Sequence, residues 1–341
     1  MASLEIEAIG LNDKGLVRKN NEDNFYLNGQ YMKREEMDQG AFFTSQCQDN
    51  TQIYAVCDGI GGTDAGEDAS LRAVRELDSW QQGGIEVVHP LDTTPVLKDI
   101  SRDIWRESEK KRRDSGTTLA MLVITGKWFF SANLGDSRVY LLRNGEFTRL
   151  SMDHSRVQQM IDMGMITPQE ARTYPGRHVI DQYMGMPEDI KFSPYFSDKM
   201  ELQPGDLFLL CSDGLTDMVE DQVIAGILTQ AESLGQMGQE LLRESYQGGG
   251  RDNITILLAK VNKAGRKKPA REKPFREKSA GVKLFKEKPA REKSVREKPV
   301  RDKSAKPSSH KALSIVLLIF QIVMGLILAV SVADFIYYLF H

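Results

Sequence analysis

The chain has 341 residues, of which 40% are hydrophobic, and a formal net charge of −3. This small net charge is unevenly distributed: residues 266–303 carry 16 Lys/Arg and 6 Asp/Glu, whereas residues 1–265 carry 27 basic and 41 acidic side chains. An acidic folded part argues against nucleic acid as the main partner, because it repels the phosphate backbone. Three widely spaced cysteines, Cys47, Cys57 and Cys211, do not resemble a disulfide framework or a zinc site. Cys57 and Cys211 end apolar runs, so we expect them to be buried free thiols in a reducing compartment. The first ten residues lack the basic and apolar regions of a signal peptide, and we expect none.

Residues 1–263 mix short apolar runs with helical patterns, and we expect them to form one folded domain. Segments rich in β-branched and aromatic residues predict strands over Ile53–Cys57, Thr118–Ile124, Trp128–Leu134, Val139–Leu142, Asp206–Cys211 and Ile254–Ala259. Apolar periodicity predicts helices over Ala65–Trp80, Pro95–Arg113, Val157–Met163, Asp221–Thr229 and Leu234–Glu244. Residues 29–52 are expected to be a lengthened loop. Because the strands come in runs, the pattern favours antiparallel sheets with helices outside them.

Residues 266–305 repeat with a period of five, as RKKPA, REKPF, REKSA, GVKLF, KEKPA, REKSV, REKPV and RDKSA. A period of five matches neither a helix nor a strand, and the recurring proline prevents a helix. We therefore expect residues 264–311 to be a disordered, extended basic linker. Three roles stay open for it: a passive tether, attraction to anionic lipid headgroups, and docking onto the acidic domain.

Residues 312–333 contain no charged side chain and would span about 33 Å as a helix, enough to cross a bilayer. The basic linker precedes this segment, so the positive-inside rule keeps residues 1–263 cytoplasmic and exports the short tail, residues 334–341. The sequence therefore predicts a single-pass anchor in the plasma membrane, the inner membrane where a bacterium has two.

Five short stretches each place an acid at the end of an apolar run or beside a turn. They are RKNNEDNF (18–25), AVCDGIGG (55–62), NLGDSR (133–138), LLCSDGLTD (209–217) and GGRDNIT (249–255). Any one of them alone is typical of a turn. If the strand ends converge, the stretches bring together Glu22, Asp23, Asp58, Asp136, Asp213, Asp217 and Asp252.

So many neighbouring carboxylates require compensating charge. Oxygen ligands without thiolate or imidazole point to Mg²⁺ or Mn²⁺ rather than Zn²⁺. Two such ions can share a bridging water and aim it in line at a phosphorus atom. Arg18, three residues before Asn21, is then a candidate to hold the phosphate.

Taken together, these stretches resemble the metal-dependent protein phosphatase (protein phosphatase 2C) family in its compact bacterial form. The matching blocks are R-x-x-N-E-D at Arg18–Asp23, D-G-x-G-G at Asp58–Gly62, S-G-T-T at Ser115–Thr118, G-D-S-R at Gly135–Arg138, D-H-S at Asp153–Ser155, S-D-G-L-T-D at Ser212–Asp217 and D-N-I-T at Asp252–Thr255. Their order matches the family and they span residues 15–260. The resemblance implies an α+β fold, a four-layer α-β-β-α sandwich with two central antiparallel sheets.

The resemblance also implies roles for individual residues at the first metal ion. Asp58 would bridge two ions, and Gly59 would offer its carbonyl oxygen to one of them. Asp213 and Asp252 would complete the shell of the first ion. Arg18 would bind the phosphate of the substrate.

Glu22 and Asp23 would serve the second ion, directly or through water. Asp136 with Asp213, and optionally Asp217, would hold a more labile third ion of the kind that bacterial members carry. The cofactors implied are two Mn²⁺ or Mg²⁺ ions, with a possible third.

The chain departs from the family at two places. Ile60 stands where eukaryotic members often carry a histidine proposed as general acid, and His154 is expected instead to cap or pack the following helix. Residues 152–197 correspond to the variable flap of the family, and their sequence gives no indication of substrate choice.

The sequence thus predicts a membrane-anchored protein serine/threonine phosphatase that reverses Ser/Thr kinase signalling. Its partners would be phosphorylated proteins, among them a transmembrane Ser/Thr kinase, and the lipid around its anchor. A narrower variant of the same chemistry would act on an anti-sigma-factor-type regulator. The alternative of another class is a degenerate phosphatase domain that serves as a membrane-tethered binding module, which should lack one or more metal ligands.

Overall fold

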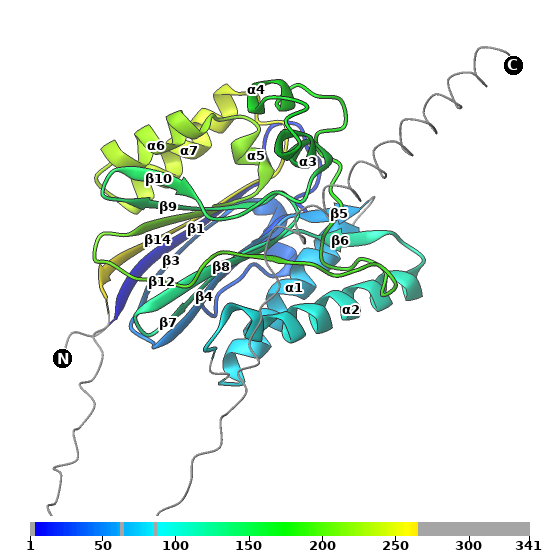
Figure 1. Ribbon diagram of the computed structural model, residues 1–341, viewed down its shortest axis with the longest axis horizontal. Coiled ribbons are helices and arrows are strands. Elements are labelled where there is room, and N and C mark those ends of the chain that lie inside the picture. The colour runs from blue at the N-terminus through cyan, green and yellow to red at the C-terminus, as the bar shows by residue number, and fades with distance from the viewer. Residues whose placement is uncertain (1–3, 62–64, 85–86, 265–341) are drawn as a thin grey trace, which may run out of the picture. The chain divides into compact units, whose positions relative to one another are not determined.

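A computed structural model describes residues 4–61, 65–84 and 87–264, all within one unit that comprises residues 1–271 (Figure 1). Two antiparallel sheets pack face to face, and helices cover both outer faces (Figure 1). The predicted linker beyond Ala264, the predicted transmembrane helix and the predicted tail lie outside the described residues. Within those residues, no helix combines the length and the apolar character needed to cross a bilayer.

The first sheet has six strands, and helices pack on its outer face. Its order is β10 (Glu146–Arg149), β9 (Arg138–Arg143), β13 (Leu207–Cys211), β14 (Ile254–Lys263), β1 (Glu5–Asp13) and β3 (Ala41–Cys47). The covering helices are α5 (Asp213–Thr216), α6 (Asp221–Gln230) and α7 (Leu234–Gln247). In α7, Leu234, Met237 and Leu241 recur at helical spacing and are buried against the sheet.

The second sheet carries its helices on the opposite side of the molecule. Its order is β11 (Tyr195–Phe196), β8 (Trp128–Leu134), β7 (Leu119–Thr125), β4 (Thr51–Cys57) and β2 (Asn24–Leu27), and β12 (Met200–Glu201) also pairs with β8. Helices α1 (Ala65–Gln82) and α2 (Thr94–Lys111) lie on its outer side (Figure 1). A separate ribbon pairs β5 (Gly59–Gly61) with β6 (Ser115–Thr117). Since helices cover both outer faces, the central strands of the sheets are buried on both sides and lack the polar alternation of a half-exposed strand.

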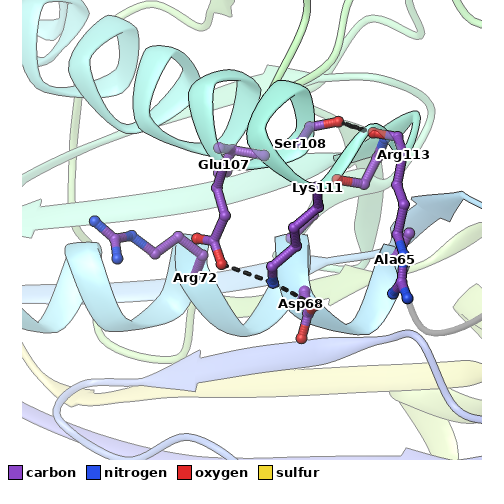
Figure 2. Close-up of a pocket in the computed structure, with 10 residues that line it drawn as sticks. Ala65, Asp68, Arg72, Glu107, Ser108, Lys111 and Arg113 are labelled. Carbon is purple, nitrogen blue, oxygen red and sulfur yellow. Dashed lines mark hydrogen bonds and ion pairs between the residues drawn. The ribbon is translucent and has the colours of Figure 1, made fainter.

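Aromatic side chains fill the space between the sheets. Phe129 of β8 meets Phe208 of β13 edge to face, with ring centroids 4.8 Å apart. Cys57 and Cys211 are buried free thiols, as expected from the apolar runs that they end, and Cys47 is a buried free thiol as well. On the outer surface, α1 and α2 are joined by ion pairs, in which Lys111 lies between Asp68 and Glu107 (Figure 2).

The predicted architecture of antiparallel sheets with outer helices is confirmed, and the Trp128–Leu134 strand has the predicted bounds. The prediction of a loop over residues 29–52 is wrong. That stretch contains the 3₁₀ helix η1 (Arg34–Gln39), strand β3 and the start of β4. β3 alternates exposed and half-buried residues because it is the edge of its sheet, so it lacks the continuous apolar run that marked the other strands.

Two further short α-helices lie in the flap: α3 (Arg156–Asp162) and α4 (Pro168–Ala171). Another 3₁₀ helix, η2 (Pro90–Thr93), leads into α2. Ser155 rather than His154 caps α3, through a hydrogen bond from the Gln158 N–H to its hydroxyl. The half-buried His154 lies next to this cap, and its Nδ1 has no hydrogen-bond partner.

Candidate functional site

The acids predicted from five separate stretches come from segments that adjoin the strands of both sheets. Glu22 and Asp23 precede β2, Asp58 joins β4 to β5, and Asp136 lies in the turn from β8 to β9. Asp213 follows β13, Asp217 ends α5, and Asp252 precedes β14. Five of these acids, called the inner acids below, are close enough for their charges to interact: Asp23, Asp58, Asp136, Asp213 and Asp252.

Asp58 is at the centre of this group. Burial raises its pKa well above the usual range, and four neighbouring carboxylates raise it further: Asp23, Asp213, Asp252 and Asp136. The strand ends that carry these five acids therefore converge, which is the condition under which the separate stretches form one group. Like charges this close to one another resist ionisation, so bound cations would stabilise the ionised form of these carboxylates.

Asp23 is the most deeply buried of the predicted acidic ligands, with 1% of its surface exposed. Its Oδ2 accepts a hydrogen bond from the hydroxyl of Thr255 at 2.7 Å, while its Oδ1 is buried without a partner. Burial raises its pKa to about 7, against the lowering effect of its hydroxyl partners. A buried carboxylate oxygen without a partner beside other acids fits a divalent cation or the water bound to one.

Arg18 is a cation at this edge of the molecule. Its Nη2 lies 2.6 Å from Oδ2 of Asp252, and it also interacts electrostatically with Glu22 and Asp58. The side chain of Arg18 is 48% exposed. One guanidinium reaches the acids from the solvent side, which leaves its other donors accessible to an anion.

The backbone around Asp58 is held by hydroxyl groups whose role the sequence did not reveal. The Asp58 N–H donates to Oγ1 of Thr118 at 3.0 Å, and the hydroxyl of Thr117 donates to the Asp58 carbonyl oxygen at 2.9 Å. Thr118 Oγ1 is in turn 2.6 Å from Oγ of Ser137, next to Asp136. The S-G-T-T and G-D-S-R blocks therefore fix the relative positions of two acids, which explains why these hydroxyl residues accompany them.

Gly59 has a structural reason to be glycine that needs no metal. A Cβ at this position would collide with the carbonyl oxygens of Gly66 and Glu22. The glycine thus lets the start of α1 approach the loop that carries Glu22. The stretch after Asp58 forms strand β5, which pairs with β6.

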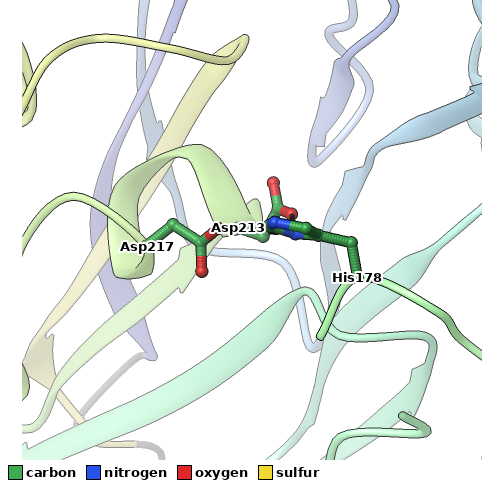
Figure 3. Close-up of side chains that lie close together, drawn as sticks. All are labelled: His178, Asp213 and Asp217. Atoms are coloured by element: carbon green, nitrogen blue, oxygen red, sulfur yellow. Dashed lines mark ion pairs between the residues drawn. The ribbon is translucent and has the colours of Figure 1, made fainter. Parts of the chain in front are cut away.

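At the outer edge of the acids, the flap supplies cations. Nη2 of Arg177 lies 3.1 Å from Oδ2 of Asp217, and Nδ1 of His178 lies 3.4 Å from an oxygen of both Asp213 and Asp217. Figure 3 shows His178 reaching toward the two carboxylates from the flap. The acids and the flap enclose a cleft of about 490 Å³, which Asp136 also lines.

This edge differs from the predicted third-ion group of Asp136, Asp213 and Asp217. Ligand atoms of Asp213 and Asp217 lie within 4.8 Å of each other and of a His178 nitrogen, and Asp136 is not in that group. Asp136 is coupled to Asp213, however, and burial with that coupling raises its pKa well above the usual range. His178 was missed because it lies in a stretch, YPGRHVIDQYMGMP, that matches no motif.

Fold and site together define a class: an α-β-β-α sandwich whose loops gather oxygen ligands suited to divalent metal ions. A model of the family described as protein phosphatase 2C matches residues 31–245. The chain belongs to that family. The individual metal-binding and phosphate-binding roles of the residues above stay predictions.

Relatives and solved structures agree with this assignment. The chain is 34% identical over 252 residues to the serine/threonine protein phosphatase PstP of Mycobacterium tuberculosis, a match that covers 73% of this chain but 44% of the relative. It is 32% identical to the serine/threonine phosphatase Stp of Listeria welshimeri, covering 73% of this chain and 94% of the relative. The PstP catalytic domain in complex with two manganese ions superposes with a TM-score of 0.62 at 29% identity, over 76% of this chain and 99% of that structure.

Proposed function

We propose that the chain is a metal-dependent protein serine/threonine phosphatase that uses two Mn²⁺ or Mg²⁺ ions, with room for a third. The observation that carries this proposal is the convergence of Asp58 with four other carboxylates from separate loops, whose charges raise its pKa. Family membership and the two manganese ions in the PstP structure support it. Since all the predicted ligands are present, nothing favours the alternative of a degenerate binding module.

Two sets of residues would hold the two ions, and Arg18 would hold the phosphate. Asp58, Asp213 and Asp252 with the Gly59 carbonyl would hold one ion, and Glu22 and Asp23 would serve the other. Bound ions would supply the missing positive charge and activate water for attack on phosphorus. Arg18 would hold phosphate oxygens with the donors that its pair with Asp252 leaves exposed.

The direct test is hydrolysis of p-nitrophenyl phosphate and of a phosphoserine peptide by the full chain in detergent, with and without Mn²⁺. We expect phosphate release that requires the ion. No release at any ion concentration would refute the proposal.

Arg18→Ala separates the phosphate-binding role from a merely structural one. Because Arg18 would bind the ground-state phosphate, we expect KM to rise by about tenfold with a smaller effect on kcat. Arg18→Lys should recover part of the loss, since one charge remains without the forked donors. An unchanged KM in Arg18→Ala would contradict the assigned role.

We also propose that residues 312–333 anchor the enzyme in the plasma membrane with residues 1–263 in the cytoplasm. The apolar segment and the basic linker before it support this. Such an anchor suits membrane-held phosphoproteins, for instance a transmembrane Ser/Thr kinase. Deleting residues 306–341 should move the protein from the membrane fraction to the soluble one. Unchanged fractionation would refute the anchor, and full in-cell dephosphorylation by the soluble form would refute its role in substrate choice.

A further inference from the structure

The flap histidine lies against two acids that the sequence had grouped with a different partner. His178 comes from the segment between α4 and β11, whereas Asp213 and Asp217 bound α5 on the other side of the cleft. Its Nδ1 is 3.4 Å from each of the two carboxylates (Figure 3). Two carboxylate oxygens and one imidazole nitrogen from opposite sides of a cleft thus share one small volume.

The spacing of these atoms suits one shared ion. Adjacent ligands in an octahedral shell with bonds of about 2.1 Å lie about 3.0 Å apart. The two nitrogen–oxygen separations of 3.4 Å need only a small inward movement to reach that value. His178 is 51% exposed, so its ring is free to make such a movement, and the cleft leaves space for water ligands.

Resting on the proposed function, we propose that His178, Asp213 and Asp217 form a mixed nitrogen and oxygen site for a divalent transition-metal ion, distinct in chemistry from the all-oxygen inner site. An imidazole favours transition metals, while Mg²⁺ prefers oxygen ligands and water. The site therefore selects Mn²⁺ over Mg²⁺. Because His178 belongs to the flap, a bound ion ties the flap to α5.

A simpler role for His178 is that of a counter-charge, like its neighbour. Arg177 lies 3.1 Å from Oδ2 of Asp217 and has no atom that can bind a metal. If both residues only neutralise the acids, removing either one should strengthen ion binding by a similar amount. If His178 is a ligand, the two substitutions have opposite effects, which makes Arg177→Gln the matched control for His178→Ala.

The experiment is Mn²⁺ titration of the full chain in detergent, made without a histidine tag and followed by electron paramagnetic resonance. We expect nitrogen coupling to one bound Mn²⁺ in the wild type, since the predicted inner ligands are all oxygen atoms. His178→Ala should abolish this coupling and weaken that Mn²⁺ by about tenfold or more, with Mg²⁺ binding changed much less. Arg177→Gln should keep the coupling and bind Mn²⁺ at least as tightly.

Absence of nitrogen coupling in the wild type, or Mn²⁺ binding in His178→Ala as tight as in the wild type, would overturn the site. Hydrolysis of p-nitrophenyl phosphate by the same samples separates this failure from that of the proposed function. Hydrolysis without nitrogen coupling refutes the His178 site alone. Nitrogen coupling without hydrolysis supports the site and refutes the phosphatase assignment.

Discussion

The inner acids around Asp58 and the flap edge around Asp217 show two ways in which a protein holds clustered carboxylates. Hydrogen bonds to threonine fix the backbone of Asp58 and the carboxylate of Asp23, both acids have raised pKa values, and Arg18 interacts with Asp58 from the solvent side. Asp217 also has a raised pKa, first by burial, but Arg177 and His178 of the flap lower it in part. The acids around Asp58 therefore depend on added ions, while Arg177 gives the flap edge a cation of its own.

The largest effect is expected from Asp58→Asn, which removes the centre of the inner group. Hydrolysis should fall by at least about a hundredfold, because ion positioning and the activated water are both lost. The metal-free protein should instead become more stable, since a buried like charge is removed. Steady-state kinetics and urea unfolding in chelator measure the two effects. Asp99→Asn on the exposed face of α2 is the control and should change neither. If Asp58→Asn lowered the free energy of unfolding in chelator and the lost activity followed from that unfolding, Asp58 would act only in folding.

The pH dependence of the free energy of unfolding, measured without metal, tests whether Asp23 lacks a compensating cation of its own. Burial raises the pKa of Asp23 from 3.8 to about 7, so the folded state holds a proton that the unfolded state releases near pH 4. The free energy of unfolding should therefore fall as the pH rises from about 4 to 7. Saturation with Mn²⁺ should reduce this slope and add about 2.7 kcal/mol at a hundred times Kd. Urea unfolding at several pH values, with and without Mn²⁺, tests this, and a flat or rising metal-free profile would contradict it.

A smaller effect, on the free energy of unfolding, is expected from a change of Asp153 at the start of the flap. Arg138 donates through Nε and Nη2 to the carboxylate of Asp153, which is 6% exposed. Asp153→Asn removes the closest charged partner of Arg138, which keeps only Asp221 at 4.0 Å, and should cost about 2 kcal/mol of unfolding free energy. Metal binding at the inner acids should persist. Thermal unfolding measures the cost, and a loss below about 0.5 kcal/mol would show that the pair does not hold the flap.

The smallest effect on the free energy of unfolding is expected from a change of Lys111 on the outer surface. Lys111 pairs with Asp68 and Glu107 between α1 and α2, but all three side chains are substantially exposed (Figure 2). Lys111→Ala should change the free energy of unfolding by less than about 1 kcal/mol and leave hydrolysis unchanged. A larger loss of stability would mean that this exposed network is stronger than solvent screening allows.

Residue patterns revealed the inner acids because each one follows or precedes a strongly apolar strand, and strand ends converge in a sheet sandwich. Asp58 and Asp252 were found in this way. Edge strand β3 lacks an apolar run and was missed. His178 was also missed, because contact between the flap and α5 depends on tertiary packing rather than on any local spacing. The acids of the site were thus predictable, while the hydroxyl groups and flap cations that surround them were not.

The central claim is that the gathered carboxylates bind divalent ions which the reaction requires. Calorimetric titration of the full chain with Mn²⁺, paired with phosphate release from a phosphoserine peptide at each ion concentration, tests it most directly. We expect at least two bound Mn²⁺ ions per chain and phosphate release that rises as they bind and stops in chelator. Phosphate release that persists in chelator, or an absence of Mn²⁺ binding, would contradict it.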